Sequence, residues 1–264
     1  MGNRRIFLLL WFFVLLGSAS AQHEKDAFLY RAKTMYHSLQ KEGLDNFSAW
    51  ITSNAFKIET ADYIKSDVSP IELIWKSPNR IFYIRRPIPG LSEENLKTVT
   101  ELQTDLVGEL KGILIDWQQF YAGNILDNLP ETHLVTFNGD TAIVQYEKYD
   151  AGQNIAVKML FGVNGSCIKV ITKNKTVDET TILYPGYILV EEKWLCTNWT
   201  VQILRGSDVE SGYAVNIRSE KVDHYWIPKR IGLEVQKKGL EKQRFIRDYE
   251  FINIITNKDI QFLK

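Results

Sequence analysis

The chain has 264 residues, 45% of them hydrophobic, and its 32 basic residues are balanced by 32 acidic residues. A chain without net positive charge lacks the basic surface that phosphate backbones require, so we expect no nucleic-acid partner. The length allows one large β-rich domain or two small ones.

Residues 1–21 have the pattern of a signal peptide. Arg4 and Arg5 precede an apolar run that ends at Gly17, and small residues follow at the expected cleavage positions. The run is shorter than the about 20 residues that cross a bilayer. We therefore expect an exported, soluble protein that starts near Gln22, located in the periplasm if the source is a diderm bacterium.

The first predicted element is an amphipathic helix from Gln22 to Leu44, with apolar residues at helical spacing from Phe28 to Leu39. Alternation in "AWITSNAFKIE" then predicts one strand, and "IELIWKSPNRIFYIRRP" predicts two strands around a turn at Ser77-Pro78-Asn79. The predicted face of the first of these strands carries Trp50, Thr52, Asn54, Phe56 and Ile58.

A second helix is predicted within an insertion around residues 91–123. Ser92 is suited to cap its start, and apolar residues recur every three or four positions as far as Tyr121. Gly108 and Gly112 each cost about 1 kcal/mol relative to alanine in a helix. The segment is therefore predicted either as one long helix, straight or bent, or as two shorter helices.

From His133 onward the pattern is almost entirely β. Short runs rich in Val, Ile, Tyr and Thr are separated by turn residues such as Asn138-Gly139 and Asn164-Gly165, which predicts an antiparallel meander. "TTILYPGYILVEEKW" and "NWTVQIL" are predicted as consecutive strands, and the last hairpin is expected to turn at Lys238-Gly239.

No catalytic signature for a nucleophile, a metal or a phosphate loop is present, and the four histidines are not spaced as metal ligands. We therefore expect a protein that is not an enzyme and that has no cofactor. A hydrolase stays an alternative, because carboxylates or a histidine and a nucleophile distant in sequence can converge in space.

The two cysteines, Cys167 and Cys196, leave two alternatives. In an exported chain they can form a disulfide, which would stabilise the fold by roughly 3–4 kcal/mol in the chain-entropy model. Alternatively, both are buried free thiols.

Both ends of the mature chain resemble the LolA-like superfamily of outer-membrane lipoprotein-sorting proteins. "YWIPKRIGLEVQKKG" and "FIRDYEFINIITNKDIQF" resemble the closing hairpin of that family, and "IWKSPNRIFYI" resembles an early strand. The matching positions are Trp75, Pro78, Arg80, Phe82, Pro228, Gly239, Tyr249, Asn253, Ile260 and Phe262.

The resemblance implies an α+β fold that is mainly antiparallel β, in which amphipathic helices cover an unclosed half β-barrel. Residues 22–264 would form this single domain, and the helix from Ser92 to Tyr121 would be its lid. The implied function is non-catalytic transport of a lipid or a lipoprotein acyl chain, with membrane-bound donor and acceptor proteins as further partners. The alternative is an envelope regulatory or structural module that binds a protein.

The apolar stripes of the predicted helix and strands give the candidate ligand-binding residues, since a curved sheet can keep an apolar cavity under one helix. These candidates are Trp50, Phe56, Trp75, Tyr83, Leu102, Leu106, Leu110, Ile113, Trp117, Phe120, Tyr213 and Ile217.

Overall fold

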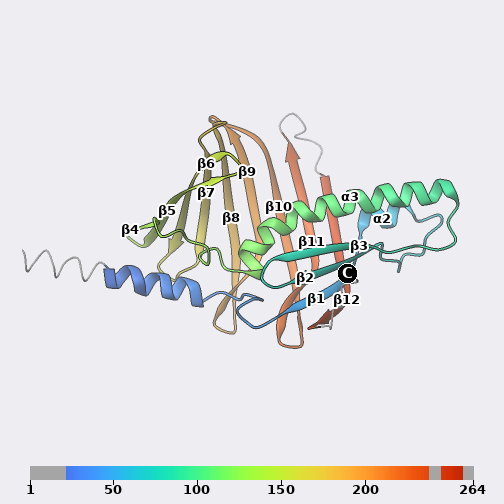
Figure 1. Ribbon diagram of the computed structural model, residues 1–264, viewed down its shortest axis with the longest axis horizontal. Coiled ribbons are helices and arrows are strands. Elements are labelled where there is room, and N and C mark those ends of the chain that lie inside the picture. Colours follow the sequence, from blue (N-terminus) through green and yellow to red (C-terminus); the bar gives the residue numbers. More distant parts are fainter. Residues whose placement is uncertain (1–21, 238–244, 258–264) are drawn as a thin grey trace, which may run out of the picture.

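A computed structural model describes residues 22–237 and 245–257, and these residues form one open antiparallel sheet with helices against it (Figure 1). The sheet has 12 strands in the order β3-β2-β1-β12-β11-β10-β9-β8-β7-β6-β5-β4. β3 and β4 are its two edges and do not pair with each other, so the sheet is not closed. The prediction of a mainly antiparallel β protein is confirmed.

The strands of the first half are β1 (Asn46–Ser53), β2 (Ile71–Lys76), β3 (Arg80–Arg85), β4 (Leu134–Asn138), β5 (Thr141–Asp150) and β6 (Gln153–Gly162). Those of the second half are β7 (Cys167–Asn174), β8 (Glu179–Val190), β9 (Lys193–Arg205), β10 (Asp208–Val222), β11 (Tyr225–Lys237) and β12 (Phe245–Thr256). The helices are an N-terminal helix (residues 22–34), α2 (Asn54–Glu59), α3 (Glu93–Trp117) and the π-helix η1 (Gln118–Ala122). The predicted signal peptide, the turn at Lys238-Gly239 and the positions Ile260 and Phe262 lie outside the described residues.

Strands β4 to β12 form the predicted meander, in which each strand pairs with the next. Strand β1 then pairs with β12, which joins the N-terminal strands β1 to β3 to the C-terminal end of the meander. In Figure 1 the strands turn from upright at β8 to β11 to nearly horizontal at β1 to β3, so the sheet curves around α3.

The curvature has a local cause in interruptions of strand register. Register shifts occur between Ser48 and Trp50 on β1, between Arg218 and Ser219 on β10, and between Gly186 and Tyr187 on β8. An extra residue on one strand bends that strand and increases its twist. These shifts are therefore local sources of the bend and twist of the sheet.

The N-terminal helix ends at residue 34, well before the predicted end at Leu44. The backbone N–H of His37 donates to the carbonyl oxygen of Trp194 at 2.9 Å, and the N–H of Trp194 donates to that of Met35 at 2.6 Å. These bonds hold residues 35–37 against β9 in a non-helical conformation. Tertiary pairing thus overrides the helical periodicity of the sequence.

The segment predicted as one strand after Ala49 is a strand followed by a helix. β1 ends at Ser53, whose hydroxyl accepts from the backbone N–H of Phe56 at 3.1 Å and caps α2. Thr60 closes the other end with a side-chain bond to the Phe56 carbonyl. The predicted alternation beyond Ser53 was therefore wrong.

The boundary predicted between β8 and β9 was also misplaced. The chain turns at Glu191-Glu192, where both residues have positive φ, 48° and 65°. Two-residue hairpin loops need this conformation, which Asn and Gly normally supply. Two glutamates give no turn signal, so the sequence favoured a continuous strand.

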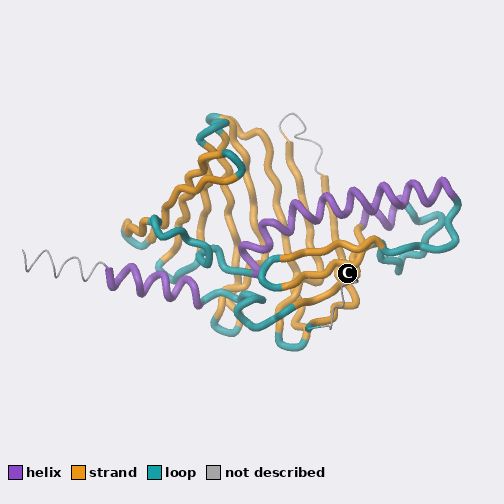
Figure 2. Tube along the Cα trace, in the orientation of Figure 1, coloured by secondary structure: helices purple, strands orange, loops and turns teal. Residues whose placement is uncertain are grey.

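Helix α3 is continuous through Gly108 and Gly112, so the alternative of two shorter helices is not realised. The Ser92 hydroxyl accepts from the N–H of Asn95, and Glu93 and Glu94 lie in the first turn, where carboxylates favour the helix dipole. Figure 2 shows α3 running across one part of the sheet and the N-terminal helix lying at the opposite end of the sheet.

Candidate functional site

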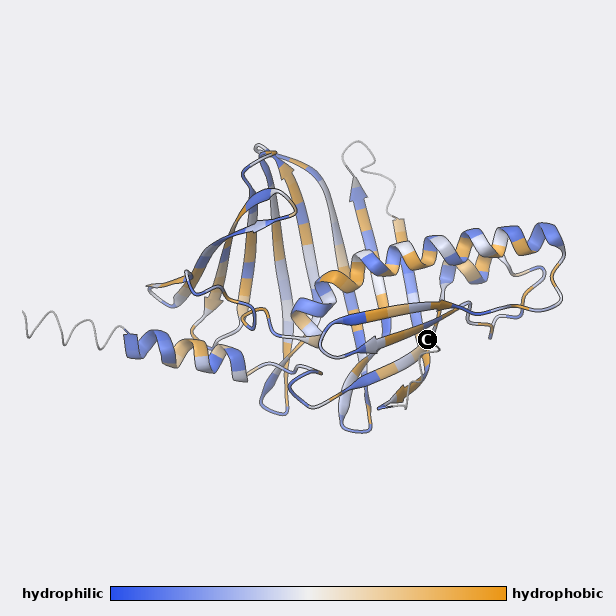
Figure 3. Cartoon of the chain, in the orientation of Figure 1, coloured by the Kyte–Doolittle hydropathy of each residue, from blue (hydrophilic) through white to orange (hydrophobic). Residues whose placement is uncertain are grey.

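The face of the sheet that α3 covers, here called the inner face, carries the main hydrophobic core. Apolar residues of α3 and η1 pack on inner-face side chains from β1, β2 and β8 to β12. Figure 3 shows how apolar residues alternate with polar ones along α3. The helix residues buried in this core are Leu106, Leu110, Ile113, Leu114, Trp117, Phe120, Tyr121 and Ala122.

A continuous apolar row crosses eight strands of the inner face. Strand register places its members opposite one another on successive strands from β11 to β4. In order they are Val235, Tyr213, Val201, Leu183, Val170, Met159, Val144 and Val135, and we call this set the inner row. Seven strand spacings of about 4.8 Å make the row about 34 Å long.

The inner row links two hydrophobic clusters. One lies beneath α3, and the other lies beneath the N-terminal helix around Phe28 and Phe161. Val170 and Tyr187 contact both clusters, while Val170, Tyr213 and Val235 keep part of their surface exposed. Val201, Leu183, Met159 and Val144 are buried, so the row is exposed only in the members between and beyond them.

Two carboxylates of α3 face the inner surface and bind tyrosines of the sheet. The Tyr213 hydroxyl donates to Asp116 at 2.6 Å, and the Tyr249 hydroxyl donates to Glu109 at 2.8 Å. The guanidinium of Arg247 lies 3.4 Å from Glu109. Burial raises the pKa of Asp116 above its ordinary value, against the opposing effect of the Tyr213 hydrogen bond. Together with apolar packing and the bonds of Gln103 to the Pro70 and Arg86 carbonyls, these polar bonds hold α3 to the sheet in its middle, at Glu109, and close to its C-terminal end, at Asp116.

The C-terminal end of α3 is fixed more firmly, through η1. The Tyr121 hydroxyl contacts the hydroxyl of Ser219 at 2.7 Å and the carbonyl oxygen of Trp226 at 2.9 Å. The Ala122 carbonyl accepts from the Ser38 hydroxyl at 3.0 Å and from the N–H of Gln40 at 3.1 Å. A π-helix is rare and often marks a functional position in a helix, and here it forms the anchored end of α3.

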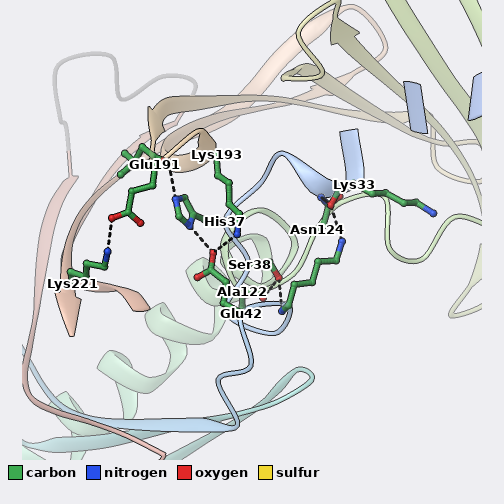
Figure 4. Close-up of polar contacts among 11 residues, drawn as sticks. Lys33, His37, Ser38, Glu42, Ala122, Asn124, Glu191, Lys193 and Lys221 are labelled. Atoms are coloured by element: carbon green, nitrogen blue, oxygen red, sulfur yellow. Dashed lines mark hydrogen bonds and ion pairs between the residues drawn. The ribbon is translucent and has the colours of Figure 1, made fainter. Parts of the chain in front are cut away.

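Residues 35–44, here called the strap, connect this anchored end to the β8–β9 hairpin (Figure 4). His37 places Nδ1 2.7 Å from Glu42 and Nε2 3.0 Å from the Val190 carbonyl. Both contacted oxygens are hydrogen-bond acceptors when Glu42 is ionised, so the ring binds each of them through a nitrogen that carries a proton. Lys193 also contacts Glu42, at 3.3 Å.

The strap should weaken in acid through Glu42. Burial opposes ionisation of this carboxyl, but the contacts from His37 and Lys193 outweigh it and lower the pKa of Glu42 below its ordinary value of about 4.5. The stabilisation is complete above that ordinary value and is lost as the pH falls through the lowered pKa. We expect the free energy of unfolding to fall less steeply with acid in Glu42→Gln than in the wild type, measured by urea denaturation. The exposed Glu131→Gln variant is the control, and equal slopes in all three proteins would contradict the prediction.

The cysteines are buried as free thiols, which is the second of the two predicted alternatives. The sulfur of Cys167 lies 3.9 Å from the Lys169 carbonyl, and that of Cys196 lies 3.5 Å from the Asn198 carbonyl. Burial raises the pKa of Cys167 to about 12 and raises that of Cys196 as well. Both thiols are therefore protonated at neutral pH and are poor nucleophiles.

The structure brings nine of the twelve predicted ligand-binding residues together at the inner face beneath α3. Seven are buried in the core, namely Trp75, Leu106, Leu110, Ile113, Trp117, Phe120 and Ile217. Tyr83 and Tyr213 pack against it and are partly buried. Contact of these residues with a ligand stays a prediction.

The other three predicted residues lie elsewhere. Phe56 is buried in a separate cluster with Ile64 and Val99, against which Leu102 also packs. Trp50 lies on the outer face, since its neighbours on β1 point into the core, and the guanidinium of Arg86 lies 3.6 Å above its ring. The predicted inward orientation of Trp50 was therefore wrong.

Sequence reasoning missed most of the inner row. Val170, Leu183 and Val201 belong to strands that were predicted, but no candidate was chosen from them. The period-two alternation of each strand was the available signal, because it separates the two faces. The register that aligns the strands is set by pairing and is not visible in one sequence.

Three comparisons find no relative for this chain: no family model, no curated protein and no solved structure matches it. Within residues 22–237 and 245–257, no group of three or more His, Cys, Asp or Glu side chains is arranged to hold a metal ion. In the same described ranges, no helix has both the length and the apolarity needed to cross a membrane.

Proposed function

We propose that the protein is a non-catalytic carrier that binds the acyl chain of a lipid or lipoprotein along the inner face of its sheet, with α3 as the lid. The proposal keeps the exported half-barrel carrier suggested by the resemblance to LolA-like proteins. The observation that carries it is the inner row, a continuous apolar track of which some members stay partly exposed.

The size of the inner row suits this ligand. The hydrocarbon core of a bilayer is about 30 Å thick, so one extended acyl chain spans roughly 15 Å. The row, at about 34 Å, is longer than such a chain. Each buried methylene contributes about 0.8 kcal/mol, which provides enough driving force for binding without a charged group.

Helix α3 now packs directly on the sheet, so ligand entry requires the helix to move. The bonds of Tyr121 and Ala122 at η1 suit a pivot, whereas Glu109 and Asp116 hold the part of α3 that precedes η1 through bonds that can break and re-form. Opening would expose apolar surface, and an acyl chain would cover it again. The ligand thereby offsets the cost of opening.

A pair of adjacent residues on β7 tests the proposal. Val170 belongs to the inner row, whereas Ile171 points to the outer face, and both are partly buried. We expect Val170→Lys to weaken binding of a fluorescent fatty-acyl probe at least tenfold, because an ammonium group would lie against the acyl chain. Ile171→Lys should bind the probe as the wild type does.

Thermal unfolding of both variants controls for general damage to the fold. Lipid extraction and native mass spectrometry of the purified wild type provide an independent measurement. Absence of bound or exchangeable lipid, together with no saturable probe binding, would overturn the carrier function. Equal losses in Val170→Lys and Ile171→Lys would place the binding site elsewhere.

A further inference from the structure

Two tryptophans beneath α3 are buried with their hydrogen-bond donors unused. Trp75 on β2 is 0% exposed and Trp117 at the end of α3 is 1% exposed, and their ring centroids are 6.3 Å apart. Among the described residues, neither indole Nε1 has a hydrogen-bond partner. Leaving a buried donor unpaired costs about 1–3 kcal/mol, so a native structure that does this twice in one place calls for a physical reason.

The surroundings of the two indoles determine which partner would suit them. Phe47 lies 5.9 Å from Trp75 and 6.2 Å from Trp117, and Tyr121 stacks on Trp117 at 5.6 Å. A charged acceptor would lose its hydration among these rings at high cost. An amide would satisfy an indole with its oxygen but would bring an N–H donor of its own. An ester carbonyl accepts and brings no donor.

The position of the pair relative to the inner row is consistent with such a ligand. Trp117 directly follows Asp116, whose carboxylate is bound to Tyr213 near one end of the row. An acyl chain that lies along the row can therefore bring its first carbons to the region beneath the C-terminal end of α3. That is where the carbonyl of an esterified chain is attached.

We propose that the indole N–H groups of Trp75 and Trp117 form a carbonyl-binding subsite that selects acyl chains linked through an ester. This inference rests on the proposed carrier function and adds the chemical class of the ligand. In the closed protein the two donors are unpaired, and in the loaded protein one or both bind the ester carbonyl. The subsite thus favours the loaded state over the closed one.

The test compares a diacyl phosphatidylcholine with its dialkyl ether analogue of the same chain lengths. Each competes with a fluorescent fatty-acyl probe for the wild type, Trp75→Phe, Trp117→Phe and the outer-face control Trp50→Phe. We expect the wild type and Trp50→Phe to bind the ester lipid about tenfold more tightly than the ether lipid. In Trp75→Phe, Trp117→Phe or both, this ratio should fall toward one while the ether lipid still binds.

The ratio is internal to each protein, so a loss of packing that weakens both lipids equally leaves it unchanged. If a phenylalanine variant does not fold, benzothienylalanine at the same position keeps the ring size and removes only the N–H. Equal binding of the two lipids by the wild type, or a ratio that persists in both variants, would overturn the subsite and leave the carrier function standing. Binding of neither lipid and no binding of the probe would remove the carrier function itself.

Discussion

The double variant Tyr213→Phe/Tyr249→Phe is expected to be less stable than the wild type and yet to bind an acyl probe more tightly. Each hydroxyl donates to a carboxylate of α3, at 2.6 Å for Tyr213 and 2.8 Å for Tyr249. A hydrogen bond to a charged group contributes about 1.5–3 kcal/mol, so its removal weakens the closed arrangement by that amount at each site. The two losses together raise the open-to-closed ratio by about 10²-fold or more, and the apparent affinity rises by the same factor while the closed state still predominates.

Urea denaturation and probe titration on the same samples measure the two effects. The exposed Tyr149→Phe variant is the matched control and should change neither. Lower stability combined with higher affinity is the informative result, because general damage to the fold would lower both. If affinity falls with stability, α3 does not act as a lid over the binding site.

Leu110→Ala and Ile115→Ala separate the inner and outer sides of α3. Leu110 is 0% exposed in the core, whereas Ile115 is 60% exposed on the same helix. Truncating a buried leucine costs about 2–5 kcal/mol through lost burial and the cavity left behind. The exposed substitution should change the free energy of unfolding by no more than about 0.5 kcal/mol.

The comparison also limits how the lid can move. A large loss in Leu110→Ala would show that packing of α3 supplies much of the stability of the fold. Opening would then have to be local and pivot at η1. A loss below about 1 kcal/mol would instead mean that α3 is weakly packed in solution.

The sequence allowed the fold class to be predicted because its signals are local. Alternation between apolar and polar residues marks the strands of the meander, and turn pairs such as Asn138-Gly139 separate them. Ser92, expected as the cap, and the apolar periodicity after it predicted α3, which starts directly after that cap at Glu93. The errors occurred at Ser53, which caps a helix that the alternation concealed, and at Glu191-Glu192, a turn without Gly or Asn.

The candidate site could be predicted only in part, because facing and register depend on distant residues. Trp75 and Trp117 were identified from their apolar context, but their unpaired indole donors became visible only in three dimensions. The facing of Trp50 depends on which face of β1 packs against the core, and alternation alone does not decide that. The bonds of Glu109 and Asp116 to tyrosines more than ninety residues away had no signal in the sequence.

The pairing of β1 with β12 determines when the sheet can be completed during synthesis of the chain. A ribosome releases β1 long before β12, and most of the chain must emerge before the first strand gains its C-terminal neighbour. Contacts so far apart in sequence form slowly. Until then strands β1 to β3 can pair only with one another, and the part of the core that β12 supplies beneath α3 is missing. A nascent chain that stops before Phe245 therefore exposes the apolar side of α3 and the unpaired edge of β1. Both features make it a substrate for proteases and chaperones.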